Sequence, residues 1–277
     1  MLSWWKKGSQ KSVNPYYLKA LQRFEAGDWR VLKDVYHLFA LKDAVMMQRA
    51  AKSIYVQLST CSSNQMIQLE KTFRTYSSLE WYASWEKVEI AFIKENIKDK
   101  REIFYVFVLG TFHPNGYFRE KCMMELSRDQ EAFPYILLRM NDWVRPIREK
   151  ATHIVYTNLD HMPIETLLIS APYLEKLLER SRCDQELAMS LYKQVQERIL
   201  KDIFQINWNR VKYYDLNVRK TIYKLILEES LLTLECINSL LEREKSAALK
   251  NYIIERVLCL YECDEKQVNV YLLFMLI

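Results

Sequence analysis

The sequence predicts an all-α fold, a right-handed α-solenoid built from antiparallel helix pairs. Its 277 residues include only four glycines and six prolines, whereas sheet proteins need many tight turns and the glycines that form them. Apolar residues recur along most of the chain at the spacing of an amphipathic helix. Short turns separate these stretches, and similar segments return at intervals of about 30–40 residues, as in a repeat protein.

The elements can be placed in order from their turn chemistry. A polar arm, residues 1–15, precedes the first helix, and Ala26-Gly27 closes that helix because glycine suits a helix C-cap. Residues 103–109 are β-branched and aromatic enough for a buried strand, but no second strand could pair with them, so we expect a buried helix. In chain order, the expected helices are 16–25, 29–41, 44–58, 65–76, 79–97, 103–112, 117–126, 130–140, 144–159, 164–180, 184–200, 202–213, 217–227, 231–242, 246–260 and 265–277.

Residues 16–277 are predicted to form a single solenoid of about six to seven repeats. The chain end, residues 268–277, carries no charge, although a terminal repeat needs a polar outer face. We therefore expect that a further helix is missing there, that this end packs on the last pair, or that it docks into a neighbouring molecule. The oligomeric state stays open. The second helices of the pairs align near Gln48, Ala83, Phe118, Ile147, Leu187, Val218 and Leu249.

One turn carries the strongest signal in the chain. Asn141-Asp142 offers short polar side chains that accept hydrogen bonds from the first turn of a following helix. An apolar-arginine pair, Ile147-Arg148, follows on that helix. A weaker copy lies 29 residues earlier, where Phe118-Arg119 occupies the place of this pair. The self-similarity of the two segments is the main reason for predicting repeats.

The two copies resemble HEAT repeats. In that family an Asp precedes the second helix, which carries an apolar-Arg pair and a small residue three positions after the Arg. Asp142, Arg148 and Ala151 fit this pattern fully. The weaker copy fits with His113 in the place of the acid and Cys122 in the place of the small residue. The resemblance implies a stack of helix pairs and carries no activity by itself.

Two other segments match the HEAT pattern in part. Asp43 and Arg49 keep the six-residue spacing, whereas Asp215 stands two residues late relative to Arg219. Residues 137–144 also resemble bacterial HEAT-repeat proteins of no settled function. The resemblance implies that these acids and arginines form a hydrogen-bonded ladder between neighbouring turns. The implied ladder residues are Asp43, Arg49, Arg119, Asp142, Arg148 and Arg219.

No catalytic signature is visible, so we predict neither an enzyme nor a cofactor. The chain has no phosphate-binding glycine loop, no HExxH, no GxSxG and no paired-cysteine metal motif. Cys259 and Cys263 share a helix face and are expected in a core. His153 and His161 bracket a turn that Cys183 could approach, but four ligands cannot be assembled, so no metal site is predicted.

Charge distribution and cysteine content indicate the class of partner and the cellular compartment. Residues 1–33 hold seven basic and two acidic residues, and the remaining 33 basic and 33 acidic residues cancel. The chain is therefore not a globally basic nucleic-acid binder. Scattered cysteines favour reduced thiols and a cytosolic protein, and no secretion signal or membrane-spanning run is expected.

Three groups of aromatic residues are candidate partner sites. Trp143 and Arg145, at the central turn, could stack on a ligand or contact phosphate. Trp81 and Trp85, on one expected helix, either pack in the core or form a partner surface. Trp4-Trp5, followed by two lysines, could rest on a membrane or a partner, or pack on the first helix.

The function that we expect is a non-enzymatic protein-interaction scaffold or adaptor of the bacterial cytosol, with a groove lined by the second helices. The alternative is a DNA-binding HEAT-like protein related to alkylpurine DNA glycosylases. Those proteins hold damaged duplexes with an Asp, tryptophans and basic residues, which Asp142, Trp143, Arg145 and Arg148 would provide here. A membrane-binding role would depend on the N-terminal arm alone.

Overall fold

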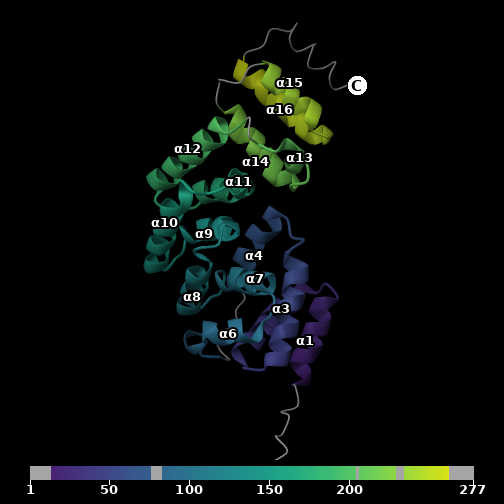
Figure 1. Ribbon diagram of the computed structural model, residues 1–277, viewed down its shortest axis with the longest axis vertical. Coiled ribbons are helices and arrows are strands. Elements are labelled where there is room, and N and C mark those ends of the chain that lie inside the picture. Colours follow the sequence, from purple (N-terminus) through teal and green to yellow (C-terminus); the bar gives the residue numbers. More distant parts are fainter. Residues whose placement is uncertain (1–13, 76–82, 204–205, 229–233, 262–277) are drawn as a thin grey trace, which may run out of the picture. The chain divides into compact units, whose positions relative to one another are not determined.

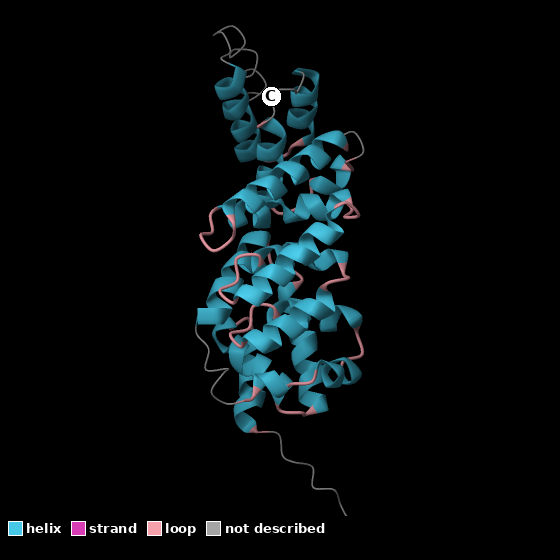
Figure 2. Cartoon of the chain, turned by 90° about the vertical axis from the view of Figure 1, so that its left-hand side faces the viewer, coloured by secondary structure: helices cyan, strands magenta, loops and turns pink. Residues whose placement is uncertain are grey.

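The computed structural model describes residues 14–75, 83–203, 206–228 and 234–261 (Figure 1). Every regular element in these ranges is a helix, which confirms the all-α prediction (Figure 2). The expected arm up to residue 13, the helix expected at 265–277 and the uncharged chain end lie outside the described residues.

Contacts divide the chain into two compact units. The first comprises Met1–Cys61 with Leu69–Glu125, and the second comprises Ser62–Gln68 with Leu126–Ile277. Helix α4 (Ser63–Thr75) contributes residues to both. The single solenoid over residues 16–277 stays a prediction.

The first unit contains helices that alternate with short 3-10 turns. Its main helices are α1 (Pro15–Glu25), α2 (Leu32–His37), α3 (Ala44–Leu58), α6 (Ile90–Asn96), α7 (Lys100–Gly110) and α8 (Gly116–Leu126). The 3-10 turns are η1 (Trp29–Val31), η2 (Leu38–Ala40) and η3 (Trp85–Lys87).

Sequence and structure agree on most boundaries of this unit. Gly27 has φ +90°, a left-handed conformation that glycine adopts freely, and it ends α1 as expected. Lys42 has φ 55° and ends the next helical stretch, which suits the break expected there. The segment 103–109 lies within helix α7, so the choice of a helix over a strand is confirmed.

The single helix expected at 79–97 is wrong for the residues that the structure describes. Trp85 begins η3, after which Val88 and Glu89 have extended backbones and α6 starts. The break is stabilised from outside the segment, because Lys121 Nζ donates to the carbonyl oxygens of Glu86 (2.7 Å) and Val88 (3.1 Å). A continuous helix would use these carbonyls for its own ladder.

An aromatic cluster forms the core of the first unit. The ring of Tyr36 contacts those of Phe73, Trp85, His113 and Phe118. The Tyr36 hydroxyl donates to the carbonyl oxygen of residue 106 at 2.9 Å. All five rings are almost completely buried, so the cluster stabilises the unit through apolar burial and ring packing.

The second unit is built from longer helices. After η4 (Gln130–Ala132) come α9 (Phe133–Arg139), α10 (Arg145–Leu159), α11 (Ile164–Leu178), α12 (Gln185–Lys201), α13 (Trp208–Val211), α14 (Leu216–Leu227), α15 (Leu234–Arg243) and α16 (Ala247–Tyr261). Helix α11 packs against α9, α12 and α14. Helix α10 packs against α9.

Hydrogen bonds fix the direction of α10 relative to α12. Near the start of α12, the Tyr156 hydroxyl donates to the carbonyl oxygen of Leu187 at 2.9 Å. Near its end, Arg198 Nη1 donates to the carbonyl oxygen of Asp160, which follows α10, at 3.1 Å. The two helices therefore run parallel, as successive second helices do in stacked helix pairs.

Candidate functional site

The site with the most chemistry is the turn between α9 and α10. Asp142 is completely buried, and its carboxylate accepts from Arg139 Nη1 (3.1 Å) and from the backbone N–H of Val144 (3.0 Å). Arg139 is also completely buried, so the two charges form an internal ion pair. Removing one partner of such a pair costs about 3–5 kcal/mol because the other charge stays buried.

Asn141 ties this turn to the next one. Its Oδ1 accepts from the backbone N–H groups of Arg182 (2.9 Å) and Cys183 (3.1 Å), which lie just before α12. The amide thus links two turns about 40 residues apart, the role that the HEAT resemblance implied for acids and arginines. Sequence reasoning used Asn141 only as a turn former and missed this link.

The two copies of the apolar-arginine pair share one geometry. Arg148 Nη1 donates to the carbonyl oxygens of Asp142 (2.6 Å) and Trp143 (3.1 Å). Arg119 Nη1 donates to the carbonyl oxygens of His113 (2.6 Å) and Pro114 (3.0 Å). In both copies the guanidinium closes its own turn, binding carbonyls six and five residues earlier.

The other implied ladder residues also have structural contacts, but with different partners. Asp43 caps α3 by accepting from the backbone N–H groups of residues 45 and 46, each at 3.1 Å. Arg49 binds Glu25 through two hydrogen bonds of 2.8 and 2.6 Å, which lower the pKa of that carboxyl. Arg219 binds Glu244, a buried residue just before α16. A continuous Asp-to-Arg ladder stays a prediction.

Trp143 and Arg145 lie at the surface of the central turn. Trp143 is 56% exposed. Arg145 is exposed too, and its Nε donates to Glu149 at 2.7 Å, which raises the pKa of the guanidinium. A large exposed ring is unusual on a turn whose neighbours are buried and bonded. These two residues therefore have the accessibility that a partner site requires.

A pocket of about 550 Å³ lies beside this turn, between α10 and the start of α12. Three arginines and a histidine line it together with two acids. Glu149 is bonded to Arg145, and Asp184 caps α12 by accepting from two backbone N–H groups. The lining residues are Met140, Arg145, Arg148, Glu149, Thr152, His153, Arg182, Cys183, Asp184 and Leu187.

Cys183 does not make this pocket a nucleophilic site. Burial raises the pKa of its thiol to about 11, so the reactive thiolate is scarce at neutral pH. His153 and Cys183 line the same pocket, but His161 does not. No group of three or more potential metal ligands occurs within the described residues.

The remaining candidates lie elsewhere. Trp85 has no exposed surface in the aromatic cluster, so the core interpretation replaces the partner-surface hypothesis for this residue. Trp81, Trp4 and Trp5 lie outside the described residues. Cys259 is exposed, which corrects the expectation of a core position, and its companion Cys263 is not described.

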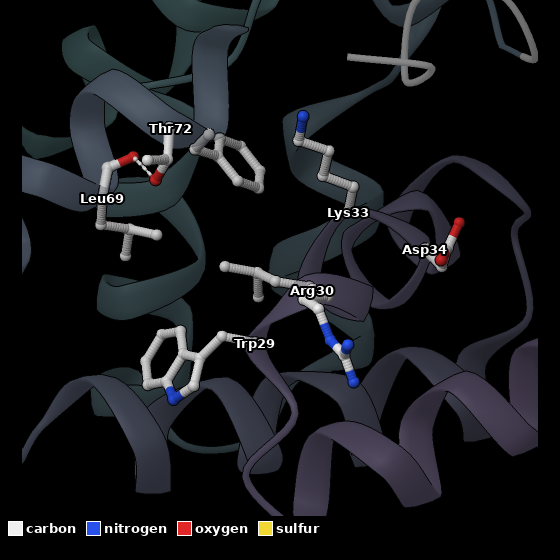
Figure 3. A pocket seen from close by; sticks show the side chains of 8 residues that line it. Trp29, Arg30, Lys33, Asp34, Leu69 and Thr72 are labelled. Atoms are coloured by element: carbon white, nitrogen blue, oxygen red, sulfur yellow. Dashed lines mark hydrogen bonds between the residues drawn. The ribbon is translucent and has the colours of Figure 1, made fainter. Parts of the chain in front are cut away.

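A second pocket, in the first unit, was not foreseen from the sequence (Figure 3). It also measures about 550 Å³. Trp29 and Leu69 lie on one side, and Arg30, Lys33 and Asp34 lie on the other. Burial lowers the pKa of Lys33 to about 8. Its walls come from η1, α2 and α4, and only folding brings these segments together.

Comparison of the chain with protein-family models, with curated proteins and with solved structures found no match. The HEAT interpretation therefore depends on the chain's own residues. Among the described helices, none is both long enough and apolar enough to cross a bilayer.

Proposed function

We propose that the protein is a cytosolic, non-enzymatic interaction module with HEAT-like repeats. The twin arginine-closed turns support this proposal, as do the parallel helices α10 and α12 and the side-chain link that Asn141 makes between turns. In repeat proteins, such links stack one helix pair on the next and leave an extended surface for partners. The right-handed solenoid is part of this proposal.

The exposure of Trp143 carries the functional part of the proposal. Its turn is held by the buried Arg139–Asp142 pair, by Arg148 and by Asn141, so the ring is presented from a well-supported backbone. Preorganised tryptophan and arginine side chains contribute most to many protein interfaces, because little entropy is lost when they bind. We name Trp143, Arg145, Arg182 and Leu187 the turn surface.

Site-specific photo-crosslinking tests the proposal. A photoreactive phenylalanine analogue at position 143 should capture a partner in cells, whereas the same analogue at Tyr117 or Tyr213 should not. Both control side chains are more exposed than Trp143, at 71% and 80%. The captured protein is identified, purified and titrated against the full chain and a Trp143→Ala variant. Equal capture at all three positions would refute the turn surface as the interface.

The nucleic-acid alternative has one observation in its favour, the three arginines that line the pocket next to this turn. Binding through phosphates weakens steeply as salt rises, because bound cations are released. Titration of labelled duplex DNA at low and moderate salt therefore separates the two functions. Salt-sensitive binding that disappears in Arg145→Ala and Arg182→Ala would favour DNA as the ligand. If no such binding is measured, the interaction with a protein partner remains the proposed function.

A further inference from the structure

The pocket between α10 and the start of α12 has the chemistry to recognise one particular kind of partner. We propose that it binds an acidic side chain of a protein segment, with an apolar residue of the same segment packed on Trp143 and Leu187. This inference extends the proposed interaction function and depends on it. The occupant is a short acidic-apolar stretch, presented by a separate protein.

Cations dominate the lining of the pocket. Arg145 and Arg148 come from α10, and Arg182 comes from the turn before α12. Arg148 uses Nη1 for two backbone carbonyls, which holds its guanidinium at the pocket wall. A guanidinium has five N–H donors, so this arginine keeps capacity for a carboxylate. Planar donors of this kind bind carboxylates bidentately.

The acids of the pocket do not cancel this attraction. Glu149 accepts from Arg145 at 2.7 Å, and Asp184 accepts from the backbone N–H groups of Glu186 and Leu187. Both carboxylates are therefore already held by donors of the chain. The starts of α10 and α12 also border the pocket, and their N-terminal dipoles favour a bound anion.

Two hydrogen bonds join the two walls of the pocket. Asn141 bonds the backbone of Arg182 and Cys183 to the turn that leads into α10. A site whose walls are joined in this way loses little conformational entropy when a ligand enters. The volume of about 550 Å³ accommodates one or two side chains, and no longer segment needs to be buried.

Two features favour a protein segment over a nucleic acid. The three arginines are gathered at one pocket, which suits a single carboxylate better than a continuous phosphate backbone. Two exposed apolar side chains accompany the arginines, since Leu187 lines the pocket and is 41% exposed, and Trp143, two residues before Arg145 on the same turn, is 56% exposed. An acidic residue beside a leucine or an aromatic residue matches both parts of this surface.

Peptide display with the full chain as bait tests the inference. The probe is a library of nonapeptides with a fixed central glutamate and random flanks, compared with a matched library that has glutamine at the centre. We expect enrichment from the glutamate library only, with leucine or aromatic residues beside the glutamate. The selected peptides should bind Arg182→Glu about tenfold or more weakly, because the new carboxylate at the pocket repels the acidic ligand.

Matched variants separate charge at the pocket from charge in general. Arg101→Glu changes an exposed arginine of the first unit by the same charge, and it should bind like the wild type. Trp143→Ala should weaken binding without altering the preference for glutamate. Equal enrichment of the glutamine library, or equal loss in Arg101→Glu and Arg182→Glu, would overturn the inference.

The inference and the proposed function can fail separately. If crosslinking at position 143 identifies a partner whose contacting segment has no acidic residue, the interaction function holds and the pocket assignment is wrong. If neither crosslinking nor display gives a position-dependent result, both are wrong. Both experiments use the intact chain, and circular dichroism of each variant verifies that it is folded.

Discussion

The turns before α8 and α10 are closed by the same arginine–carbonyl hydrogen bonds but lie in different surroundings. In each, an arginine binds the carbonyl oxygens six and five residues earlier. Arg119 is completely buried, and its turn places His113 inside the aromatic cluster of the first unit. Arg148 is only half-buried, and its turn places Trp143 at the surface.

Replacements at equivalent positions explain the difference. With the 29-residue offset, His113 corresponds to Asp142 and Gly110 corresponds to Arg139. The second copy fills its turn with a buried ion pair between Arg139 and Asp142. The first copy has neither charge, and a buried imidazole takes the place of the carboxylate. The two copies therefore share the backbone closure and differ in the side chains inside it.

The largest contrast should come from removing the two arginines. Arg119→Ala leaves two carbonyls without their donor in a fully buried place and should cost about 3 kcal/mol of unfolding free energy. Arg148→Ala should cost about 1 kcal/mol, because water can reach part of the exposed site. Urea unfolding of both variants measures this difference. Equal losses would show that burial does not distinguish the two turns.

A second prediction concerns the small residue that follows each arginine. Cys122 occupies the place of Ala151, and its Sγ would lie 2.3 Å from a Cβ added at Gly110. Gly110→Ala should therefore cost about 2 kcal/mol through overpacking. In a Cys122→Ala background the added methyl group meets less obstruction. The free energy of unfolding of the double variant should exceed, by about 1 kcal/mol, the value obtained by adding the losses of the two single variants. Strict additivity would contradict the close packing of Gly110 and Cys122.

The buried histidine should make the first turn sensitive to acid. Burial, followed by the Arg119 charge, lowers the pKa of His113 to about 3 in the folded state. An unfolded chain has the ordinary value of about 6.5, so it binds a proton first as pH falls. The folded state therefore loses stability below about pH 6.5, by about 1.4 kcal/mol per pH unit until the folded pKa is reached.

His113→Asn isolates this effect. Asparagine can keep an acceptor for the backbone N–H of Asn115, which His113 Nδ1 now accepts at 3.0 Å, but it does not titrate. Between pH 7 and pH 5 the wild type should lose about 2 kcal/mol more than the variant. Urea unfolding at both pH values checks this difference. Parallel losses in the two proteins would mean that the imidazole is protonated in the folded state as easily as in the unfolded chain.

The helical fold follows from the sequence because its determinants are local. Helix caps and the apolar-arginine pair are read within one turn, and Gly27 and Lys42 end their helices where expected. The break at Val88 was missed because its carbonyls bind Lys121, a residue on another helix. A contact with a residue on another helix cannot be predicted from the local sequence pattern.

The sequence predicts only part of the candidate site, because the rest depends on contacts between distant segments. Trp143 and Arg145 could be named from the sequence, since they remained after the HEAT pattern had given roles to their neighbours. Arg182 could not be named, because Asn141 brings its turn beside α10 through a contact about 40 residues apart in sequence. Trp85 has the same residue type as Trp143, and only burial distinguishes a core ring from an exposed one.

The smallest expected effect on stability is the most informative for function. Trp143→Ala should change the free energy of unfolding by no more than about 0.5 kcal/mol, because a residue that is 56% exposed contributes little burial to stability. Tyr117→Ala replaces an exposed aromatic residue at the start of α8; it is the control and should change stability as little. Only Trp143→Ala should also lower affinity for the crosslinked partner. A large loss of stability in Trp143→Ala would assign the ring to packing, and the twin turns would then have the same structural role.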